Sequence, residues 1–178
     1  MPVQRFWATL RQGLDQALEA ANAAPGDIAA VSYSSQANTF LLLDSADEPL
    51  TPLIFWTDLR ADPVEGELAS LWEGGEFLQA TGIGITGEGL CLSKAAWLRK
   101  HRPEIWKQAV RMQTISDYFV YAMTGRPVGD EGTASLTGLW NLPARDFWQP
   151  SLDAAGLSAG LLSRPLPPGT TRRTCRSP

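Results

Sequence analysis

The chain has 178 residues, of which 44% are hydrophobic, and a net charge of -4 at pH 7. This composition suits a single globular domain with a core large enough to fold. Its 15 basic and 19 acidic residues are interspersed, so the sequence shows no basic surface for nucleic acid or an anionic membrane. Small neutral ligands and protein partners remain compatible with it.

Cysteine and histidine are too scarce to form a disulfide framework or a zinc site. Cys91 and Cys175 are far apart in the chain, and His101 is the single histidine. Isolated cysteines favour a reducing compartment, and zinc needs three or four clustered ligands. No stretch approaches the roughly 20 apolar residues that cross a bilayer, and the N-terminus lacks a basic-then-apolar signal. We therefore expect a cytoplasmic protein with no metal ligands of its own.

The first half of the chain alternates between helical and strand patterns. Residues 4–23 carry apolar side chains at helical spacing up to a Pro-Gly pair, which predicts an amphipathic helix packed on the rest of the protein. Residues 28–33, 39–43 and 53–56 are short and apolar on both faces, as strands are when both sides of a sheet are covered. Residues 62–72 have a helical composition.

The second half is predicted to be mainly helical. Ser93 is positioned to cap one helix, and Pro103 to open a second helix that runs to Ala109. Residues 112–115 resemble a strand, followed by a helix at 117–124 with Ser116 or Asp117 as its cap. A last helix is predicted at 148–155, and the sequence loses periodicity from Pro165.

Gly82, Gly84 and Gly87 have the G-x-G-x-x-G spacing of a dinucleotide-binding loop. The segment before them does not resemble a buried parallel strand, and no acidic residue follows where a ribose would need one. The pattern therefore favours a mobile glycine-rich loop.

A group of polar residues interrupts the predicted strands at 28–33 and 39–43. Gln36 and Asn38 each offer donors and an acceptor, which the hydroxyls of a polyol require. Trp56 supplies a flat apolar face, Asp58 only accepts hydrogen bonds, and Arg60 only donates them. Together these side chains predict a concave sugar-binding site. The alternative is that they are polar strand ends that face water.

These residues also carry a resemblance to a known family. The segment "IAAVSYSSQANTFLLLDSADEPLTPLIFWTDLRA" resembles the strand, Gln-containing loop and Trp-x-Asp-x-Arg of the FGGY carbohydrate kinases, near xylulokinase and gluconokinase. "LSKAAWLRKHRPEIWKQA" is similar to the Lys-x-x-Trp-Leu and Pro-Glu helices of that family, and "ISDYFVYAMTGRPVGDEGTASLTGLWNL" to its later motifs. The resemblance covers the chain from Phe6 to about Leu162.

The resemblance implies an α/β fold. Family members have two ribonuclease H-like, actin-like domains, with sugar bound in the N-terminal domain at the interdomain cleft and ATP held mainly by the second. Residues 1–164 are accordingly expected to form a partial N-terminal sugar-binding domain, a mixed sheet flanked by helices, and 165–178 an irregular tail. The implied substrate-binding residues are Gln36, Ala37, Asn38, Trp56, Asp58 and Arg60, with Lys94 and the loop around Gly89 approaching the same pocket.

The chain also departs from the family pattern. Ser32 and Ser35 stand where relatives often have glycine, and Ala37 and Asn38 replace a larger pair, which leaves the identity of the sugar open. The phosphate-binding Asp-x-Gly-Thr and the Gly-x-Asp of the general base have no counterpart in the sequence, and Asp117, Asp130 and Asp146 do not match the base. We therefore expect a chain that is incomplete at both ends and contains no catalytic residue.

The leading hypothesis is that the chain is a fragment of an ATP-dependent carbohydrate kinase, which transfers the γ-phosphate of ATP to a sugar or polyol hydroxyl. On this hypothesis ATP and Mg²⁺ belong to the complete enzyme, and the chain alone binds neither and is inactive. The alternative is a non-catalytic sugar-binding or protein-interaction fragment. The absent strands further predict an exposed sheet edge and self-association through it.

Overall fold

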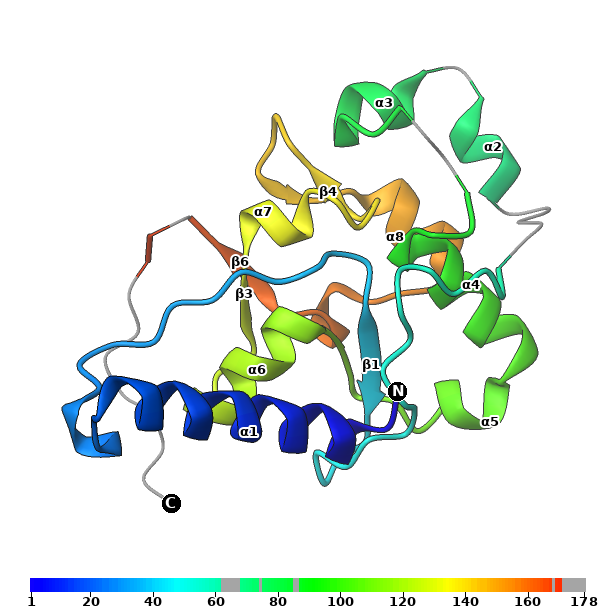
Figure 1. Ribbon diagram of the computed structural model, residues 1–178. Coiled ribbons are helices and arrows are strands. Elements are labelled where there is room, and N and C mark those ends of the chain that lie inside the picture. Colours follow the sequence, from blue (N-terminus) through cyan, green and yellow to red (C-terminus); the bar gives the residue numbers. More distant parts are fainter. Residues whose placement is uncertain (62–67, 74, 85–86, 168, 171–178) are drawn as a thin grey trace.

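The computed structural model describes residues 1–61, 68–73, 75–84, 87–167 and 169–170 (Figure 1). It confirms a mixed α/β architecture of helices around small sheets. The central sheet pairs β1 (Phe40–Leu43) with β2 (Arg111–Thr114) in antiparallel register, so that Phe40 faces Thr114 and Leu43 faces Arg111. The strands predicted at 39–43 and 112–115 are thus confirmed.

Strand β1 is covered on both faces, as its continuous apolar run predicts. Phe40 and Leu42 belong to the larger core, together with Leu92 and Leu98. Leu41 and Leu43 point the other way, into a smaller core that contains Val3, Leu53 and Tyr121. This alternation follows from the two-residue period of a strand, and it holds β1 rigidly at the start of the segment that carries the candidate site.

Short helices and strand pairs surround the central sheet. The helices are α2 (Ala69–Trp72), α3 (Glu76–Thr81), α4 (Cys91–His101), α5 (Pro103–Trp106), α6 (Ile115–Thr124), α7 (Glu131–Ala134) and α8 (Gln149–Ala155), with 3-10 turns at Pro25–Asp27 and Ala159–Leu161. Strand β3 (Val128–Asp130) pairs in parallel with β6 (Arg164–Leu166), and β4 (Trp140–Asn141) forms a hairpin with β5 (Asp146–Phe147). None of the described helices is both long and apolar enough to cross a membrane.

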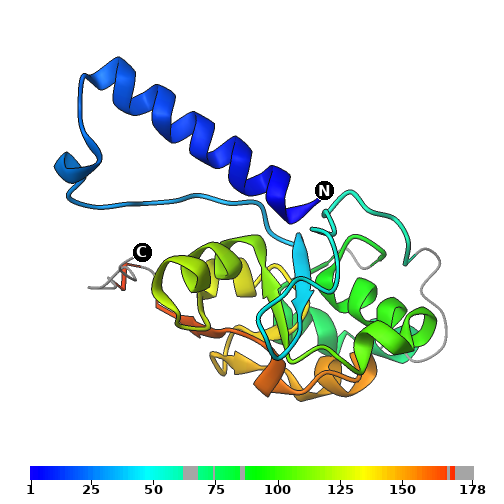
Figure 2. The same ribbon diagram turned by 90° about the horizontal axis from the view of Figure 1, so that it is seen from below.

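Helix α1 (Val3–Ala21) is present as predicted, but most of it is not packed. Val3 is its one buried residue, and near it the Trp7 indole donates a hydrogen bond of 3.3 Å to the Tyr118 hydroxyl and stacks on Phe119. Figure 2 shows the far end of the helix standing away from the rest of the protein. The prediction that α1 packs on the protein therefore holds for its first turns only.

Residues 28–33 do not form the predicted strand. They are exposed and make no sheet pairing within the described part of the chain. The composition is strand-like, but a strand also needs a neighbour to bond its backbone groups. Residues 53–56 are reduced to a bridge in which Ile54 pairs with Phe40, on the side of β1 opposite to β2.

Two of the predicted helix caps are wrong. Helix α4 begins at Cys91, and the Ser93 hydroxyl inside it donates to the Gly87 carbonyl at 2.6 Å. Helix α6 is capped by Thr114, whose hydroxyl accepts from the Asp117 amide at 3.2 Å. Strand β2 runs directly into α6, so the last strand residue takes the capping position.

The helix predicted from Pro103 to Ala109 is shorter than expected, because α5 ends at Trp106.

Three other predictions fall partly outside the described residues. The helix expected at 62–72 is seen as α2, and residues 62–67 are not described. The glycine-rich loop is described except for residues 85–86. The expected irregular tail begins later than predicted, because β6 occupies Arg164–Leu166. The helix at 148–155 is confirmed as α8.

The carboxyl group of Asp117 is buried beside the backbone of β3. It lies so close to Gly129 that a side chain there would collide with it, and the two residues line a cavity of about 30 Å³ with Asp130 and Ser163. Burial raises the pKa of Asp117 to about 7, although hydrogen bonding with Thr114 opposes the shift. The folded protein therefore holds this carboxyl with a proton at pH values where the unfolded chain has released it.

This difference predicts stability that falls as pH rises. A carboxyl whose pKa goes from 3.8 unfolded to about 7 folded stabilises the protein fully below pH 4 and loses that contribution, about 4 kcal/mol, up to pH 7. Urea unfolding of the native protein and Asp117→Asn at pH 5 and pH 8 measures it. The variant should lose most of the pH dependence, whereas the exposed control Asp153→Asn should retain it. Equal pH dependence in all three proteins would contradict the assignment.

Candidate functional site

Asn38 is the residue that brings distant segments together. Its backbone has a left-handed conformation, with φ of 60°, which asparagine tolerates better than most residues. Its Nδ2 donates to the Leu136 carbonyl at 2.8 Å, and its Oδ1 accepts from the Cys91 amide at 2.8 Å. Cys91 is the first residue of α4, whose own capping position makes no side-chain bond, so Asn38 caps α4 from outside it.

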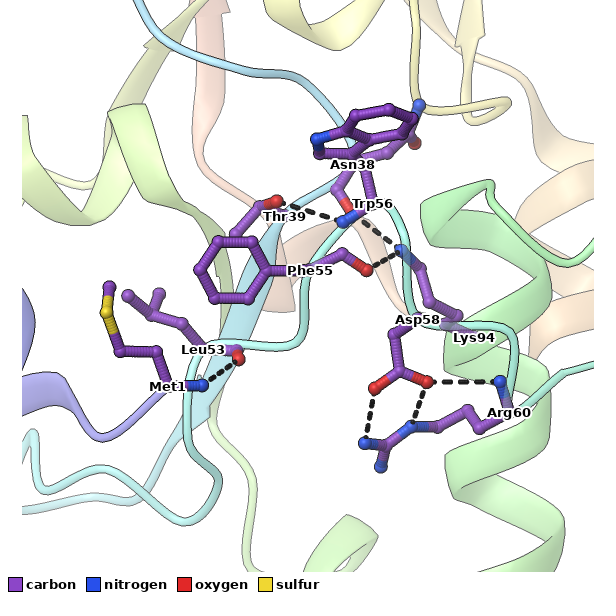
Figure 3. Close-up of polar contacts among 9 residues, drawn as sticks. All are labelled: Met1, Asn38, Thr39, Leu53, Phe55, Trp56, Asp58, Arg60 and Lys94. Carbon is purple, nitrogen blue, oxygen red and sulfur yellow. Dashed lines mark hydrogen bonds and ion pairs between the residues drawn. The ribbon is translucent and has the colours of Figure 1, made fainter.

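Lys94 connects Asn38 to the segment that carries Trp56 (Figure 3). Its side chain is 0% exposed, and its Nζ donates to the carbonyl of Asn38 at 2.7 Å and to that of Phe55 at 2.8 Å. No carboxylate forms an ion pair with it among the described residues. Desolvation accordingly lowers the pKa of Lys94. The ammonium group thus donates hydrogen bonds to backbone carbonyls in two separate segments.

Trp56 lies beside Asn38 with its indole largely in solvent. The side chain is 53% exposed, and Figure 3 shows the ring next to Asn38. Its backbone amide donates to the buried hydroxyl of Thr39 at 3.1 Å. The glycine-rich loop lies close to the backbone of Trp56, because a side-chain carbon at Gly89 would lie 3.5 Å from the Trp56 carbonyl oxygen. The indole is therefore held by its backbone while its face stays accessible.

Asp58 and Arg60 form an ion pair with each other. The guanidinium donates two bonds to the carboxylate, of 2.9 and 2.7 Å, and the Arg60 amide adds a third of 3.0 Å. These bonds hold the pKa of Asp58 below its usual value. The guanidinium also lies 5.3 Å from the centre of the Trp97 ring. Figure 3 shows the pair separated from the Trp56 indole, so these two charges form the margin of the site rather than its centre.

Gln36 and Ala37 precede Asn38 on the half-buried end of the connecting segment. Within the described part of the chain, the Gln36 carboxamide makes no hydrogen bond, whereas both ends of the Asn38 carboxamide are bonded. Of the predicted residues, the structure thus brings Asn38 and Trp56 together, with Gln36 and Ala37 adjacent in the chain. Of these two carboxamides, that of Gln36 is the one available to bond a ligand.

Sequence reasoning left Thr39 and Phe55 out of the site and gave Lys94 no specific contact. Thr39 and Phe55 contribute a buried hydroxyl and a backbone carbonyl, which side-chain patterns do not reveal. The available signal for Lys94 was a lysine within an otherwise apolar stretch of α4. Lysine is almost never fully buried without a partner, so a lysine in this position is a signal from which a bonded ammonium could have been predicted.

The described residues contain no cluster of side chains that could hold a metal ion. No group of three or more His, Cys, Asp or Glu side chains gathers among them. Asp130 uses both carboxylate oxygens on Thr133, with bonds of 2.7 Å to the amide and 2.8 Å to the hydroxyl. Cys91 is buried and unpaired, and burial raises the pKa of its thiol to about 12, which makes it a poor nucleophile. The side chains described at this site can offer ring stacking by Trp56 and hydrogen bonding by Gln36.

Comparison with known proteins identifies the family. The model of the FGGY family of carbohydrate kinases, N-terminal domain, matches residues 2–175. The chain belongs to this family. Among its relatives are the xylulose kinase of Streptomyces rubiginosus, 31% identical over 97% of the chain, and the autoinducer-2 kinase of Escherichia coli strain K12, 35% identical over 90% of it. The chain spans about a third of the length of these FGGY kinases, 35% and 30% respectively.

Solved structures of FGGY kinases share the fold. The gluconate kinase of Lactobacillus acidophilus superposes with a TM-score of 0.78 and 27% identity, over 86% of this chain and 31% of that protein. The prediction of family and fold class is therefore confirmed. The roles of the individual site residues remain predictions.

The two hydrogen bonds of the Asn38 side chain predict a specific loss of stability. Asn38→Ala removes both bonds and places alanine at a positive φ, so it should destabilise the protein by about 3 kcal/mol. Asn22 is a matched control, because it ends α1 with φ of 49°, where its backbone amide bonds to Glu19 and Leu18, and no side-chain hydrogen bond joins it to another described residue. Asn22→Ala should cost only about 1 kcal/mol, for its conformation. Equal losses in urea unfolding would show that the Asn38 bonds contribute nothing.

Proposed function

We propose that this chain is the sugar-recognising part of an ATP-dependent FGGY carbohydrate kinase, which transfers the γ-phosphate of ATP to a hydroxyl of a sugar or polyol. The observation that carries the proposal is the exposed Trp56 indole, fixed beside Asn38 by the buried ammonium of Lys94. Family membership and the kinase names of the relatives support the reaction class. The reducing compartment indicated by the sequence fits a cytoplasmic sugar kinase.

Each residue has a definite part in the proposed pocket. Trp56 stacks its ring on the C–H face of the sugar, and the Gln36 carboxamide both donates to and accepts from hydroxyls. Asn38 shapes the pocket rather than reading the ligand, because its carboxamide is already bonded. Ala37 leaves room for the substrate. Asp58 and Arg60 present their paired, partly exposed groups at the margin.

Nucleotide binding is assigned to parts of the complete enzyme outside this chain. Among the described residues no carboxylate set fits Mg²⁺, since Asp130 is bonded to Thr133 and Asp117 is buried. Phosphoryl transfer depends on positioned phosphates and on stabilisation of their charge. We therefore expect this chain alone to bind the sugar without phosphorylating it.

The second candidate is a non-catalytic fragment that binds sugar or another protein and associates with itself. The exposed apolar residues on and after α1, among them Leu14 and Val31, favour an interaction surface in this chain. Both candidates include the sugar pocket. They differ in whether this chain functions as part of a complete kinase.

Calorimetric titration with a panel of pentoses, hexoses, ketoses and polyols tests the sugar site. At least one member should bind the native chain, and Trp56→Ala should weaken that binding about tenfold or more, the loss of about 1.4 kcal/mol of stacking. Leu59→Ala is the matched control, an apolar residue of the same loop that is 59% exposed. Its affinity should equal that of the native chain. Equal binding by the Trp56 variant, or no binding of any panel member, would contradict the pocket.

A further inference from the structure

The guanidinium of Arg60 has two neighbours that can fix its orientation. Asp58 accepts two hydrogen bonds from it, of 2.9 and 2.7 Å, and the ring of Trp97 lies with its centre 5.3 Å from the central guanidinium carbon. A planar guanidinium suits both neighbours, because it can bond a carboxylate and also contact an aromatic ring. Asp58 belongs to the same short segment as Arg60. Trp97 belongs to α4, and its contact therefore joins the segment to the body of the protein.

Trp97 has contacts that do not involve Arg60. The residue is half-buried and packs against the larger core. Its ring also stacks on the imidazole of His101, one turn further along α4, with 4.8 Å between the ring centres and 28° between the ring planes. These contacts give the indole an orientation of its own, which it can impose on the guanidinium.

Helix α4 contacts the segment that carries Trp56 at two points. Lys94 donates a hydrogen bond of 2.8 Å to the Phe55 carbonyl at the start of this segment (Figure 3). Trp97 contacts Arg60 at its end. Lys94 and Trp97 are three residues apart, which makes them neighbours on the surface of the helix. The exposed Trp56 lies between the two points of contact, so a single helix can restrict the segment on both sides of the indole.

Packing alone is the alternative explanation for Trp97, because a half-buried tryptophan beside a core needs no cation. The two explanations differ in what a replacement must supply. Packing requires an apolar side chain of suitable volume, whereas the contact with a guanidinium requires an aromatic ring. Leucine and tyrosine at position 97 therefore distinguish them.

We propose that Trp97 is a positioning residue for the proposed sugar site. Its ring orients the Arg60 guanidinium, and the Asp58–Arg60 pair then fixes the end of the segment whose start is fixed by Lys94. Trp56 is thereby presented to the ligand from a segment that is held at both ends. Trp97 acts through Arg60 and does not contact the ligand. Its effect on sugar binding rests on the proposed function, whereas its contact with Arg60 does not.

Titration of the Asp58 carboxyl by NMR tests the contact without a ligand. The hydrogen bonds from Arg60 hold the pKa of Asp58 below its usual value. Trp97→Leu releases the guanidinium, so the pKa of Asp58 should rise toward that value, whereas Trp97→Tyr keeps a ring and should leave it low. Trp106→Leu is the matched control, a half-buried tryptophan packed on the same core, and should not change it. The same Asp58 pKa in Trp97→Leu and in the native chain would overturn the proposal.

Arg60→Met tests the same contact from the other side and leaves the core beneath Trp97 intact. The Arg60 side chain is 31% exposed, so circular dichroism should show native folding. The side-chain NMR resonances of Trp97 should shift in this variant. Those of Trp72, whose ring contact is with Phe77, should stay in place. Unchanged Trp97 resonances would exclude the contact even if Trp97→Leu failed to fold.

Calorimetric titration tests the positioning role. For a sugar that binds the native chain, Trp97→Leu should weaken binding about threefold, and Trp97→Tyr should retain most of the affinity. In Arg60→Met, the further change Trp97→Leu should cause no additional loss, because Trp97 acts through Arg60. An equal loss in both backgrounds would contradict this role. Absence of binding by every sugar would overturn the sugar site itself, and the Asp58 titration separates that failure from a failure of the Trp97 contact.

Discussion

The buried ammonium of Lys94 is the interaction on which the candidate site depends. Removing an ammonium from water costs several kcal/mol, and no carboxylate among the described residues compensates that cost as an ion pair. Charge-assisted bonds to two carbonyls, each contributing about 1.5–3 kcal/mol, offset it. The arrangement adds little net stability. Its effect is to fix the Asn38 segment relative to the Phe55 segment.

Several weaker contacts complete this link around β1. The Ile54 bridge aligns the second segment with the strand, and the Thr39 hydroxyl holds the Trp56 amide. Asn38 then caps α4, the helix from which Lys94 extends. The result is a closed set of bonds among β1, the segment through Trp56 and α4. The Trp56 indole projects from this set into solvent with its backbone immobilised, as a preorganised binding surface requires.

The elements that could be predicted from the sequence are those whose own residues form a regular pattern. Strand β1 has a continuous apolar run, and helices α1 and α6 repeat apolar residues at helical spacing. Residues 28–33 have the same apolar character as β1, yet they form no strand because pairing depends on a partner that local composition does not specify. The site shows the same limit. Asp58 and Arg60 were predicted as an acceptor and a donor for the ligand, but their spacing lets them bond each other. The backbone carbonyls that Lys94 binds cannot be predicted from the side-chain pattern.

Amide hydrogen exchange in Lys94→Met measures the central link most directly. Two amides report on it, that of Trp56, bonded to Thr39, and that of Cys91, bonded to Asn38. Both should exchange faster together in the variant, while the amide of Leu42 inside the core keeps its protection. Lys100→Met, an exposed position on the same helix, should change neither. If the Trp56 and Cys91 amides stay as protected in Lys94→Met as in the native chain, Lys94 does not hold the site together.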